Sequence, residues 1–322
     1  MALLGAGYWG RRLLRALLEV PGVDRVHCFD PRPDVRAWVG GHFGTVEVAD
    51  RPERLLDDQR IAGAVIATPA ATHATLAAHW LASGRHVLVE KPIALDPNTA
   101  IELTELAARR GRALLPGHTY LYSGAARALR ALVRNGDLGR PVWLQSDRLN
   151  LGRFRPDVSV LWDLAPHDAA LLVDLLDAEV TSCHALGWPQ GTSAPDVCSV
   201  LLATAEGTGV GWHLSWRAPE KVRRVMLVGS DATAIWDDLD ATWPIKVYTT
   251  QFGHVGSAGA GEYQARLGQC LIPTVDRTEP LLRECRHFVD VLLGVSAPCV
   301  GPEHIIKVTS ILAQAEAALS RS

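Results

Sequence analysis

The chain has 322 residues, which is too many for one ordinary hydrophobic core and suits one large or two medium domains. The formal net charge is −3 with both signs interspersed, so nucleic acid and anionic membranes are poor candidates for the main partner. No stretch approaches eighteen uninterrupted apolar residues, and no secretory leader pattern opens the chain. We therefore expect a cytoplasmic protein. The six cysteines are scattered without a Cys-x-x-Cys pair, which predicts reduced thiols and no metal site.

The first 120 residues alternate between short apolar runs and segments of helical periodicity. Strands are predicted at 24–30, 64–67, 86–89 and 113–115, and helices at 72–81 and 100–108. Such alternation is typical of parallel strands joined by right-handed helical crossovers. The sequence thus predicts an α/β domain with a doubly wound parallel sheet over residues 1–120.

A glycine-rich turn follows the first apolar residues and opens a helix. It reads Gly5-Ala6-Gly7-Tyr8-Trp9-Gly10, a dinucleotide-binding (Rossmann) fingerprint when an acid follows about twenty residues on. Gly5 permits the tight turn, Gly7 lets the backbone approach a pyrophosphate, and Gly10 allows close helix packing. We expect this turn, with Tyr8 and Trp9, to bind the cofactor. Only residues 1–4 precede it, so either the first strand is short or the natural start lies upstream.

The second predicted strand ends in Asp30, which supplies the acid of the fingerprint. Its carboxylate is expected to accept hydrogen bonds from the adenosine ribose hydroxyls, and its charge would repel a 2′-phosphate. NAD is therefore predicted in preference to NADP. Arg32 lies two residues later and could reverse the preference, so NADP stays open as an alternative.

The apolar run at 86–89 ends in Glu90-Lys91-Pro92. A strand that simply reaches water would explain this ending. In a doubly wound sheet, however, these residues lie at the carboxyl end of a central strand, where ligands bind. A lysine beside a nicotinamide can hydrogen-bond a substrate hydroxyl, and partial desolvation favours the neutral amine that proton transfer needs. The chain has only four lysines, so a lysine at this position favours a functional role.

These motifs resemble those of the glucose–fructose oxidoreductase and inositol dehydrogenase family (Gfo/Idh/MocA). The resemblance rests on the glycine-rich turn, on Thr68-Pro69 followed by His73, and above all on Glu90-Lys91-Pro92, and it extends over essentially the whole chain. It implies that the cofactor site includes Thr68, Pro69, His73, Glu90, Lys91 and Pro92. In that family the corresponding Lys–Pro bond is often cis, so the resemblance implies a cis bond between Lys91 and Pro92.

Residues 121–322 are predicted to form a second, α+β domain for substrate binding and oligomerisation. Helices are expected near 125–133 and 305–319, and strands at 142–148, 197–204, 209–216 and 224–229. The last three strands are interpreted as an antiparallel meander. The sequence therefore predicts a C-terminal domain with an open, largely antiparallel sheet.

The segment from Leu161 to Asp168 carries candidate chemistry. Pro166 fits only the first turn of a helix, so Asp163 lies at or near the N-cap, and a capping carboxylate is one interpretation. Helical spacing would also bring Asp163 and His167 to one face, where the carboxylate can orient the imidazole as a base. The resemblance implies the second interpretation. In it Lys91 hydrogen-bonds the hydroxyl, His167 takes its proton, and Asp163 orients the pair while hydride passes to the nicotinamide.

Finer similarity, at 148–152, 216–224 and 279–288, is to family members that act on sugars and nucleotide sugars, often at C3. The candidate substrate ligands are His118, Arg148, Asn150, Arg153 and Trp162. Arg148, Arg153 and Arg155 could hold a phosphate or carboxylate of the substrate. Ordinary surface charge explains these three arginines equally well.

Val210, Trp212, Leu214 and Trp216 alternate along one face of a predicted strand. This pattern fits either core beneath a helix or a subunit interface. The resemblance implies a homodimer or homotetramer that associates through the C-terminal sheet.

The sequence thus predicts an NAD-dependent oxidoreductase that acts on a secondary hydroxyl or ketone of a sugar, in particular a nucleotide sugar. One alternative is a redox-neutral enzyme of the same family, an epimerase or glycosidase that recycles tightly bound NAD. The other is a cofactor-binding regulator without turnover.

Overall fold

The computed structural model describes residues 1–152, 158–189, 194–255 and 262–320. It divides into two compact units, one formed by Met1–Tyr122 with Thr278–Ala313 and the other by Ser123–Arg277 with Gln314–Ser322. The predicted boundary at residue 120 assigns all later residues to the second domain. In the structure residues 278–313 belong to the first unit, because helix α9 (Pro280–Leu292) packs against α1 (Tyr8–Glu19).

The first unit is built on a parallel sheet. Among the described residues six strands pair in the order β3-β2-β1-β4-β5-β6, and every pair is parallel. The strands are β1 (Ala2–Leu4), β2 (His27–Phe29), β3 (Glu47–Val48), β4 (Gly63–Ile66), β5 (His86–Glu90) and β6 (Leu114–Gly117). The order reverses between β1 and β4, and ligands bind at the carboxyl ends of strands at such a point. The predicted doubly wound sheet is confirmed, with a central strand β1 of only three residues.

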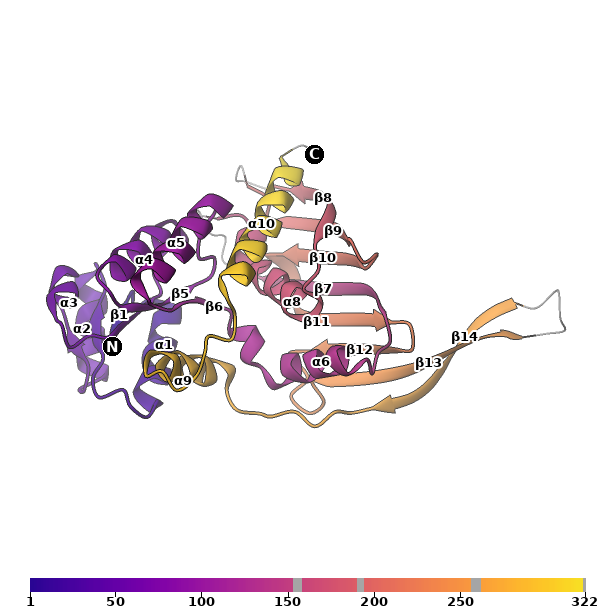
Figure 1. Cartoon of the computed structure of the whole chain (residues 1–322), viewed down its shortest axis with the longest axis horizontal. Helices are drawn as coiled ribbons and strands as arrows, with labels where there is room; N and C mark the ends of the chain where they lie inside the picture. Colours follow the sequence, from indigo (N-terminus) through magenta and orange to yellow (C-terminus); the bar gives the residue numbers. More distant parts are fainter. Residues whose placement is uncertain (153–157, 190–193, 256–261, 321–322) are drawn as a thin grey trace. The chain divides into compact units, whose positions relative to one another are not determined.

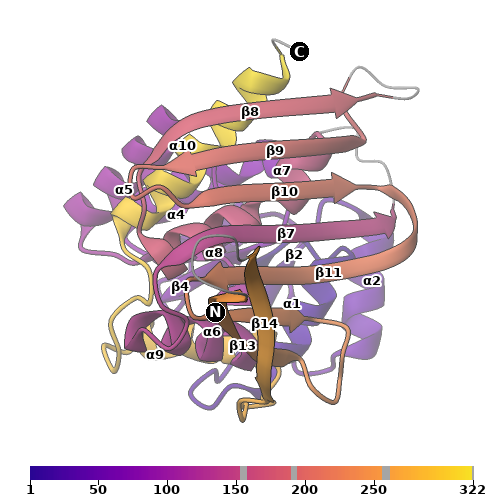
Figure 2. The ribbon, with the colours of Figure 1, turned by 90° about the vertical axis from the view of Figure 1, so that its right-hand side faces the viewer.

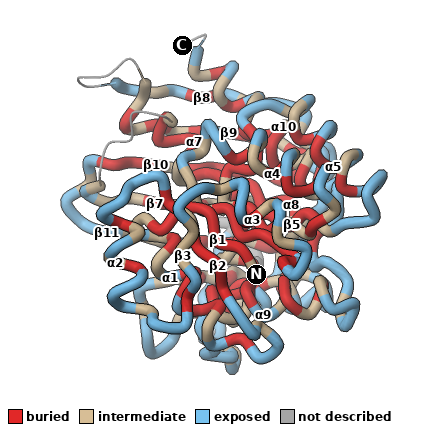
Figure 3. The backbone as a smooth tube through the Cα atoms, turned by 90° about the vertical axis from the view of Figure 1, so that its left-hand side faces the viewer, coloured by how far each residue is buried: buried red, intermediate tan, exposed pale blue. Residues whose placement is uncertain are grey.

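Helices cover both faces of this sheet, so the strands of the first unit are largely buried (Figure 3). On one face lie α1, α2 (Pro33–His42) and α9, and on the other lie α3 (Glu53–Asp57), α4 (His73–Ala82) and α5 (Pro97–Arg110). Alternate residues of β1 serve the two faces: Leu3 joins the first cluster of apolar side chains and Leu4 the second. The run of small and branched apolar residues in each strand follows from this double burial.

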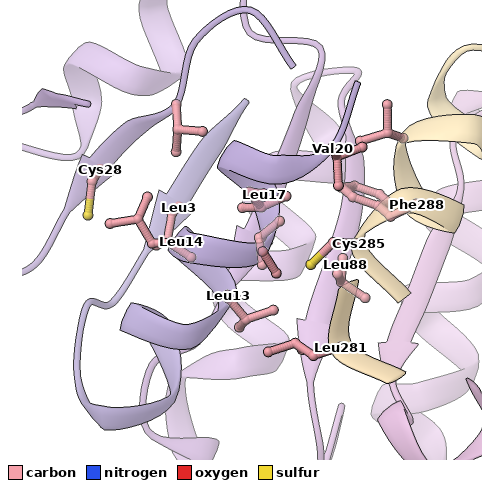
Figure 4. Close-up of a cluster of buried hydrophobic side chains, with 14 of the residues drawn as sticks. Leu3, Leu13, Leu14, Leu17, Val20, Cys28, Leu88, Leu281, Cys285 and Phe288 are labelled. Carbon is pink, nitrogen blue, oxygen red and sulfur yellow. The ribbon is translucent and has the colours of Figure 1, made fainter. Parts of the chain in front are cut away.

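The contact between α1 and α9 explains why the C-terminal stretch belongs to the first unit. Figure 4 shows Leu13 and Leu17 of α1 near Leu281, Cys285 and Phe288 of α9. Leu13, Leu17 and Phe288 are fully buried. Burying each such side chain contributes about 1.5–3 kcal/mol, so these contacts together fix α9 on the sheet.

Two helices have both ends specified by local sequence. The Asp96 carboxylate accepts a hydrogen bond from the Thr99 N–H at the start of α5, which ends at the left-handed Gly111. Helix α6 (Gly124–Asn135) begins in the same way, with the Ser123 hydroxyl accepting from Ala126 N–H, and ends at the left-handed Gly136. A polar N-cap and a glycine at the C-terminus are the usual boundaries of helices.

The second unit contains a mixed sheet. Its described residues form eight strands in the order β14-β13-β12-β11-β7-β10-β9-β8, and only the β7–β10 pair is parallel. The strands are β7 (Pro141–Leu151), β8 (Val180–Trp188), β9 (Val197–Thr204), β10 (Gly209–Ser215), β11 (Arg217–Gly229), β12 (Ala232–Asp237), β13 (Ile245–Val255) and β14 (Glu262–Leu271). Strands β13 and β14 run on as a two-stranded arm beyond the end of β12 (Figure 1).

The predicted meander of 197–229 is wrong, because β7 lies between β10 and β11. The first residues of β11 curve around the end of β7 (Figure 2), and the pairing of β11 with β7 is irregular between Arg217 and Val222. A single residue, Trp216, therefore separates two strands that are not neighbours in the sheet.

Helices cover one face of the second sheet: α6, α7 (Val160–Leu164), α8 (Pro166–Leu176) and the end of α10 (Pro302–Leu319). Val210, Trp212 and Leu214 of β10 and the adjoining Trp216 are each at most 3% exposed, and β10 contacts α7. The interpretation of this stripe as core beneath a helix is confirmed. No helix in the described part of the chain is both long and apolar enough to cross a membrane.

Substitution of Gly10 tests the packing of the glycine-rich turn. A Cβ at Gly10 would lie 2.0 Å from the backbone oxygen of Gly5, whereas a Cβ at Gly41 in α2 meets no atom within 4 Å. We expect Gly10→Ala to lower the free energy of unfolding by about 2 kcal/mol or more, because backbone must move to relieve the overlap.

Gly41→Ala is the matched control, and its better helix propensity should leave stability unchanged or slightly raised. Urea denaturation of both variants measures the difference. Equal unfolding midpoints would contradict the packing described.

Candidate cofactor and active site

The glycine-rich turn forms a close-packed surface at the start of α1. Gly5 has φ of +90°, and a Cβ there would lie 2.5 Å from the Ala67 oxygen. At Gly7 the nearest atom to an added Cβ is a guanidinium nitrogen of Arg32, at 3.7 Å. No side chain caps the helix at Gly7, so the N–H groups of its first turn are available to an anion. These features fit the pyrophosphate of a dinucleotide.

Asp30 at the end of β2 already has partners within the chain. It is 2% exposed, and its Oδ2 accepts a hydrogen bond from the Ala6 N–H at 2.9 Å. The Arg32 guanidinium donates to both carboxylate oxygens, at 2.9 and 3.0 Å. Burial acts to raise the pKa of Asp30, but the hydrogen bonds from Arg32 and Ala6 outweigh it and hold the pKa below its usual value.

This pairing changes the basis for predicting the cofactor. The carboxylate expected to repel a 2′-phosphate is neutralised by a guanidinium whose side chain is 58% exposed and lies near Gly7. A carboxylate has about four acceptor sites, so Asp30 can still accept a ribose hydroxyl. The preference for NAD therefore depends on the balance between Asp30 and Arg32.

The predicted residues of the nicotinamide end come together at the carboxyl ends of β4 and β5. The Lys91–Pro92 bond is cis, as the resemblance implied. His73 is buried, and its two ring nitrogens lie 2.7 Å from the Pro92 oxygen and 2.8 Å from the Thr68 oxygen. His73 thus joins the turn after β4, which includes Pro69, to the turn after β5.

A second contact joins the glycine-rich turn to the end of β5. The Trp9 indole N–H donates a hydrogen bond to Oε1 of Glu90. Glu90 pairs with Gly117 of β6, where an added Cβ would lie 3.0 Å from the Glu90 carboxyl carbon. Lys91 therefore follows a strand end that is held on both sides.

Sequence reasoning missed two residues of the first unit near this strand end, buried Glu284 and partly exposed His304. Glu284 of α9 is fully buried, and its Oε2 accepts a hydrogen bond from the Thr119 hydroxyl at 2.7 Å. Burial, with a further contribution from the charge of Glu90, raises the pKa of Glu284 well above its usual value. The ring of His304 lies 5.6 Å from that of His118, which is 4% exposed. No local motif marks Glu284 or His304, because both lie far along the chain from the glycine-rich turn.

In the second unit, Asp163 does not cap the helix that follows it. Ser159 is the N-cap of α7 and Ala165 that of α8, so Asp163 lies within α7 and His167 in the first turn of α8. The Trp216 indole N–H donates to Oδ2 of Asp163 at 3.1 Å. Both Asp163 and His167 are partly exposed. The Asp163 carboxylate is thus held in place by the sheet rather than by the start of the helix.

Arg148 has a structural partner. It is 5% exposed, and its Nε donates to Oδ1 of Asp168 at 2.6 Å, where the Ser146 hydroxyl also donates. Burial raises the pKa of Asp168 despite the opposing effects of Arg148 and Ser146. The pair fastens α8 to β7, so surface charge is the wrong interpretation of Arg148.

The remaining substrate candidates differ in what the structure says of them. Trp162 of α7 is 6% exposed and contributes to the core of the second unit. Asn150 near the end of β7 is partly exposed, with its amide nitrogen beside Gly152. Arg153 and Arg155 lie outside the described residues.

Asp30→Ser should raise the ratio of NADP affinity to NAD affinity by about tenfold or more, because the carboxylate is lost and the Arg32 guanidinium is released for a 2′-phosphate. Titration of both reduced cofactors by fluorescence gives the two dissociation constants. The pair Asp58–Arg60 has the same hydrogen-bond pattern elsewhere in this unit, so Asp58→Ser is a matched control that should leave the ratio unchanged. An unchanged ratio in Asp30→Ser would show that other residues set the preference.

His118 should make stability depend on pH. Burial first, and then the neighbouring His304 and Lys91, lower the pKa of His118 well below its usual value. Between the two pKa values the unfolded imidazole is protonated and the folded one is not, so stability falls as the pH drops below about 6.5. The loss in Tm between about pH 7.5 and about pH 5.5 should be smaller in His118→Gln than in the wild type. The exposed His184 gives the control His184→Gln, which should keep the wild-type difference. The same loss in all three proteins would contradict this role.

Both halves of the chain match models of one family. Residues 1–118 match the oxidoreductase family model with an NAD-binding Rossmann fold, and residues 126–235 match the GFO/IDH/MocA C-terminal domain. A UDP-N-acetylglucosamine 3-dehydrogenase of Acidithiobacillus ferrooxidans is 31% identical over 180 residues, which are 55% of this chain and 56% of that protein. An inositol 2-dehydrogenase of Streptomyces avermitilis is 31% identical over 215 residues, 64% of this chain and 63% of that protein. Each alignment thus spans less than two thirds of the relative.

Solved structures share the fold over nearly the whole length. The Acidithiobacillus ferrooxidans protein has a TM-score of 0.81 at 23% identity, covering 99% of this chain and 97% of that chain. GenD2 from gentamicin A biosynthesis, solved in complex with NAD, has a TM-score of 0.83 at 24% identity, covering 99% and 93%. The two family models, the NAD-binding fold of the first unit and the mixed sheet of the second agree, and the chain belongs to the Gfo/Idh/MocA oxidoreductase family.

Proposed function

We propose that the protein is an NAD-dependent dehydrogenase of a secondary hydroxyl on a sugar ring, and that its substrate is a nucleotide sugar oxidised at C3. The observation that carries the proposal is the hydrogen bond from Trp9 to Glu90. It ties the phosphate-binding turn to the strand end that presents Lys91, so cofactor and lysine share one edge of one sheet. Ligands of doubly wound folds bind at this edge.

The relatives support the substrate class. One is named for oxidation of UDP-N-acetylglucosamine at position 3 and another for oxidation of inositol at position 2. Both names describe a ring carbon that bears a secondary hydroxyl. The choice of a nucleotide sugar and of C3 follows the first of them.

In this mechanism a bound NAD would supply the acceptor for the hydride of the ring carbon. Lys91 donates a hydrogen bond to the hydroxyl oxygen of that carbon and stabilises the negative charge that develops on it. His167 accepts the hydroxyl proton as general base. Two electrons and the hydrogen leave as hydride, the proton stays on His167, and the product is a ketone.

Asp163 has the role of a positioning residue. Its carboxylate accepts the indole N–H of Trp216, which fixes it on the side of the sheet that carries α7. A carboxylate held in this way stabilises the imidazolium that forms when His167 takes the proton. In the reverse direction the same groups protonate a ketone while hydride returns to the ring carbon.

Substitution of the two proposed proton-handling residues tests the mechanism. Lys91→Ala and His167→Ala should each lower turnover by about a hundredfold or more, the usual scale for general acid–base groups, while NAD still binds. Lys246 forms a surface pair with Asp240, so Lys246→Ala is the control and should keep wild-type turnover. Steady-state kinetics together with cofactor titration separates the two effects. Near-normal turnover in both variants would overturn the assignment.

The substrate is found by following nicotinamide absorbance with NAD and a panel of UDP-N-acetylglucosamine, other nucleotide sugars, free sugars and cyclitols. Reduction of NAD with nucleotide sugars alone supports the proposal in full, and reduction with cyclitols alone rejects the nucleotide sugar. Conversion of substrate without net NAD reduction would identify a redox-neutral enzyme. Cofactor binding without conversion of any compound would favour a regulator.

A further inference from the structure

Glu284 of α9 is a buried carboxyl group that the proposed mechanism does not use. The residue is fully buried, and the Thr119 hydroxyl donates a hydrogen bond to its Oε2 at 2.7 Å. Its Oε1 has no hydrogen-bond partner among the residues that the structure describes. Burying a carboxylate with so few donors costs free energy, so the protonated form of Glu284 competes with the ionised form.

A second carboxyl group, that of Glu90, reaches the same end of β6. Glu90 pairs with Gly117 across β5 and β6, and a Cβ at Gly117 would lie 3.1 Å from Oε1 of Glu90. Thr119, which donates to Glu284, lies two residues further along the chain. Burial first, and then the charge of Glu90, raise the pKa of Glu284 well above its usual value. Neighbouring carboxyl groups do not ionise independently, because each charge disfavours the other.

Other titratable side chains from several elements lie near this pair. They are Lys91 after β5, His118 after β6, Tyr122 of η2 (Thr119–Tyr122), Cys285 of α9 and Cys299 after α9. Burial raises the pKa of Tyr122 and of Cys285 and lowers that of His118, so these three side chains are neutral near pH 7. The charge of Glu90 is therefore the negative charge that acts on Glu284.

The pair lies in the half of the sheet that the nicotinamide would occupy. The strand order β3-β2-β1-β4-β5-β6 is that of two mononucleotide-binding halves. Asp30 at the end of β2 assigns the adenosine ribose to the first half, which leaves β4, β5 and β6 for the nicotinamide. The hydrogen bond from Trp9 to Glu90 joins this second half to the turn that fits the pyrophosphate.

We propose that the carboxyl pair of Glu90 and Glu284 takes up one proton when bound NAD is reduced and releases it when NADH is oxidised. The nicotinamide ring is a cation in NAD and neutral in NADH. A nearby cation favours two carboxylates, and its loss favours one carboxylate and one carboxylic acid. The proton comes from solvent by way of Glu90 or Thr119, which are both partly exposed. It is distinct from the hydroxyl proton that His167 accepts.

The sign of the pH dependence follows from linkage. Where Glu284 is protonated in the NADH complex and ionised in the NAD complex, NADH binds with the greater uptake of protons. Raising the pH therefore weakens the binding of NADH relative to that of NAD. Two unit charges about 10 Å apart, at an effective dielectric constant of about 20, change an equilibrium constant on the order of tenfold.

The test is calorimetric titration of the full chain with NAD and with NADH, without any sugar, in two buffers of different ionisation enthalpy. The comparison of buffers gives the number of protons taken up with each ligand. At about pH 7.5, NADH should bind with about 0.3 or more protons beyond those taken up with NAD. The ratio of NAD affinity to NADH affinity should rise about threefold or more between about pH 7 and about pH 8.5.

Glu284→Gln keeps the shape of the carboxylic acid but cannot ionise. It should remove the difference in proton uptake and make the affinity ratio independent of pH over this range. Glu316→Gln is the matched control. Glu316 also accepts a hydrogen bond from a hydroxyl, that of Ser159, and burial raises its pKa, but it belongs to the second unit. This variant should keep the wild-type difference.

Thr119→Val retains both carboxyl groups and removes the hydrogen bond that lowers the pKa of Glu284. The rise of the affinity ratio should therefore move to higher pH. This variant also tests the pair if Glu284→Gln does not fold.

Equal proton uptake with NAD and NADH in the wild type would overturn the proposal, and so would a difference that persists in Glu284→Gln. Glu284 would then only fasten η2 to α9. The inference rests on the cofactor of the proposed function and not on its substrate. The expected difference in proton uptake without oxidation of any sugar leaves the carboxyl pair standing and removes the dehydrogenase. Oxidation of a sugar with equal proton uptake does the reverse.

Discussion

The first unit depends on the close approach of backbone to backbone at its glycine-rich turn. Gly10 has no room for a Cβ beside the Gly5 carbonyl, and Gly5 has none beside Ala67. Because both positions are glycine, α1 starts directly above the end of β1 and brings Trp9 within reach of Glu90. The same placement of α1 creates the apolar surface on which α9 packs. One steric condition thus fixes the phosphate-binding turn, the strand end that carries Lys91, and the return of the chain to the first unit.

At the carboxyl edge of this sheet, burial and neighbouring charges shift the pKa values of the polar side chains. Glu284 is fully buried, and burial favours its neutral form, while Glu90 nearby accepts the indole N–H of Trp9. His118 is likewise kept neutral beside His304 and Lys91. Burying a charge costs free energy, so few of these buried groups are ionised at the same time. Perturbed titration of several neighbouring groups is typical of functional sites.

Local patterns predicted most strands of the first unit and its helices α1, α4 and α5, whereas α2, β3 and α3 were not predicted. Alternating strands and helices, the glycine spacing and the acid at Asp30 are all local signals, and each predicted element was found where the pattern places it. The contribution of α9 could not be predicted, because nothing within 280–292 says that its apolar face packs on α1 rather than on the second sheet. Local patterns could not predict the order of β7, β10 and β11 either, since strand order depends on pairing between distant segments.

In the candidate site too, local motifs were predictable and contacts between distant segments were not. Residues defined by motifs, such as Gly5, Thr68 and Lys91, lie where the motifs indicate. Partners that come from distant segments were not predicted. The position of Pro166 suggested a helix cap at Asp163, whereas in the structure Trp216, next to β10, donates a hydrogen bond to its carboxylate. Spacing reports which residues share a turn of helix, and it cannot report which strand lies beneath them.

The ion pair of Arg148 and Asp168 affects how activity screens of this protein should be read. Asp168 is the immediate neighbour of His167, so the pair anchors the turn of α8 that carries the proposed base. Removing one partner of a buried pair leaves an uncompensated charge and costs about 3–5 kcal/mol. Loss of activity in an Arg148 variant is therefore evidence of a substrate contact only where the variant keeps the wild-type fold.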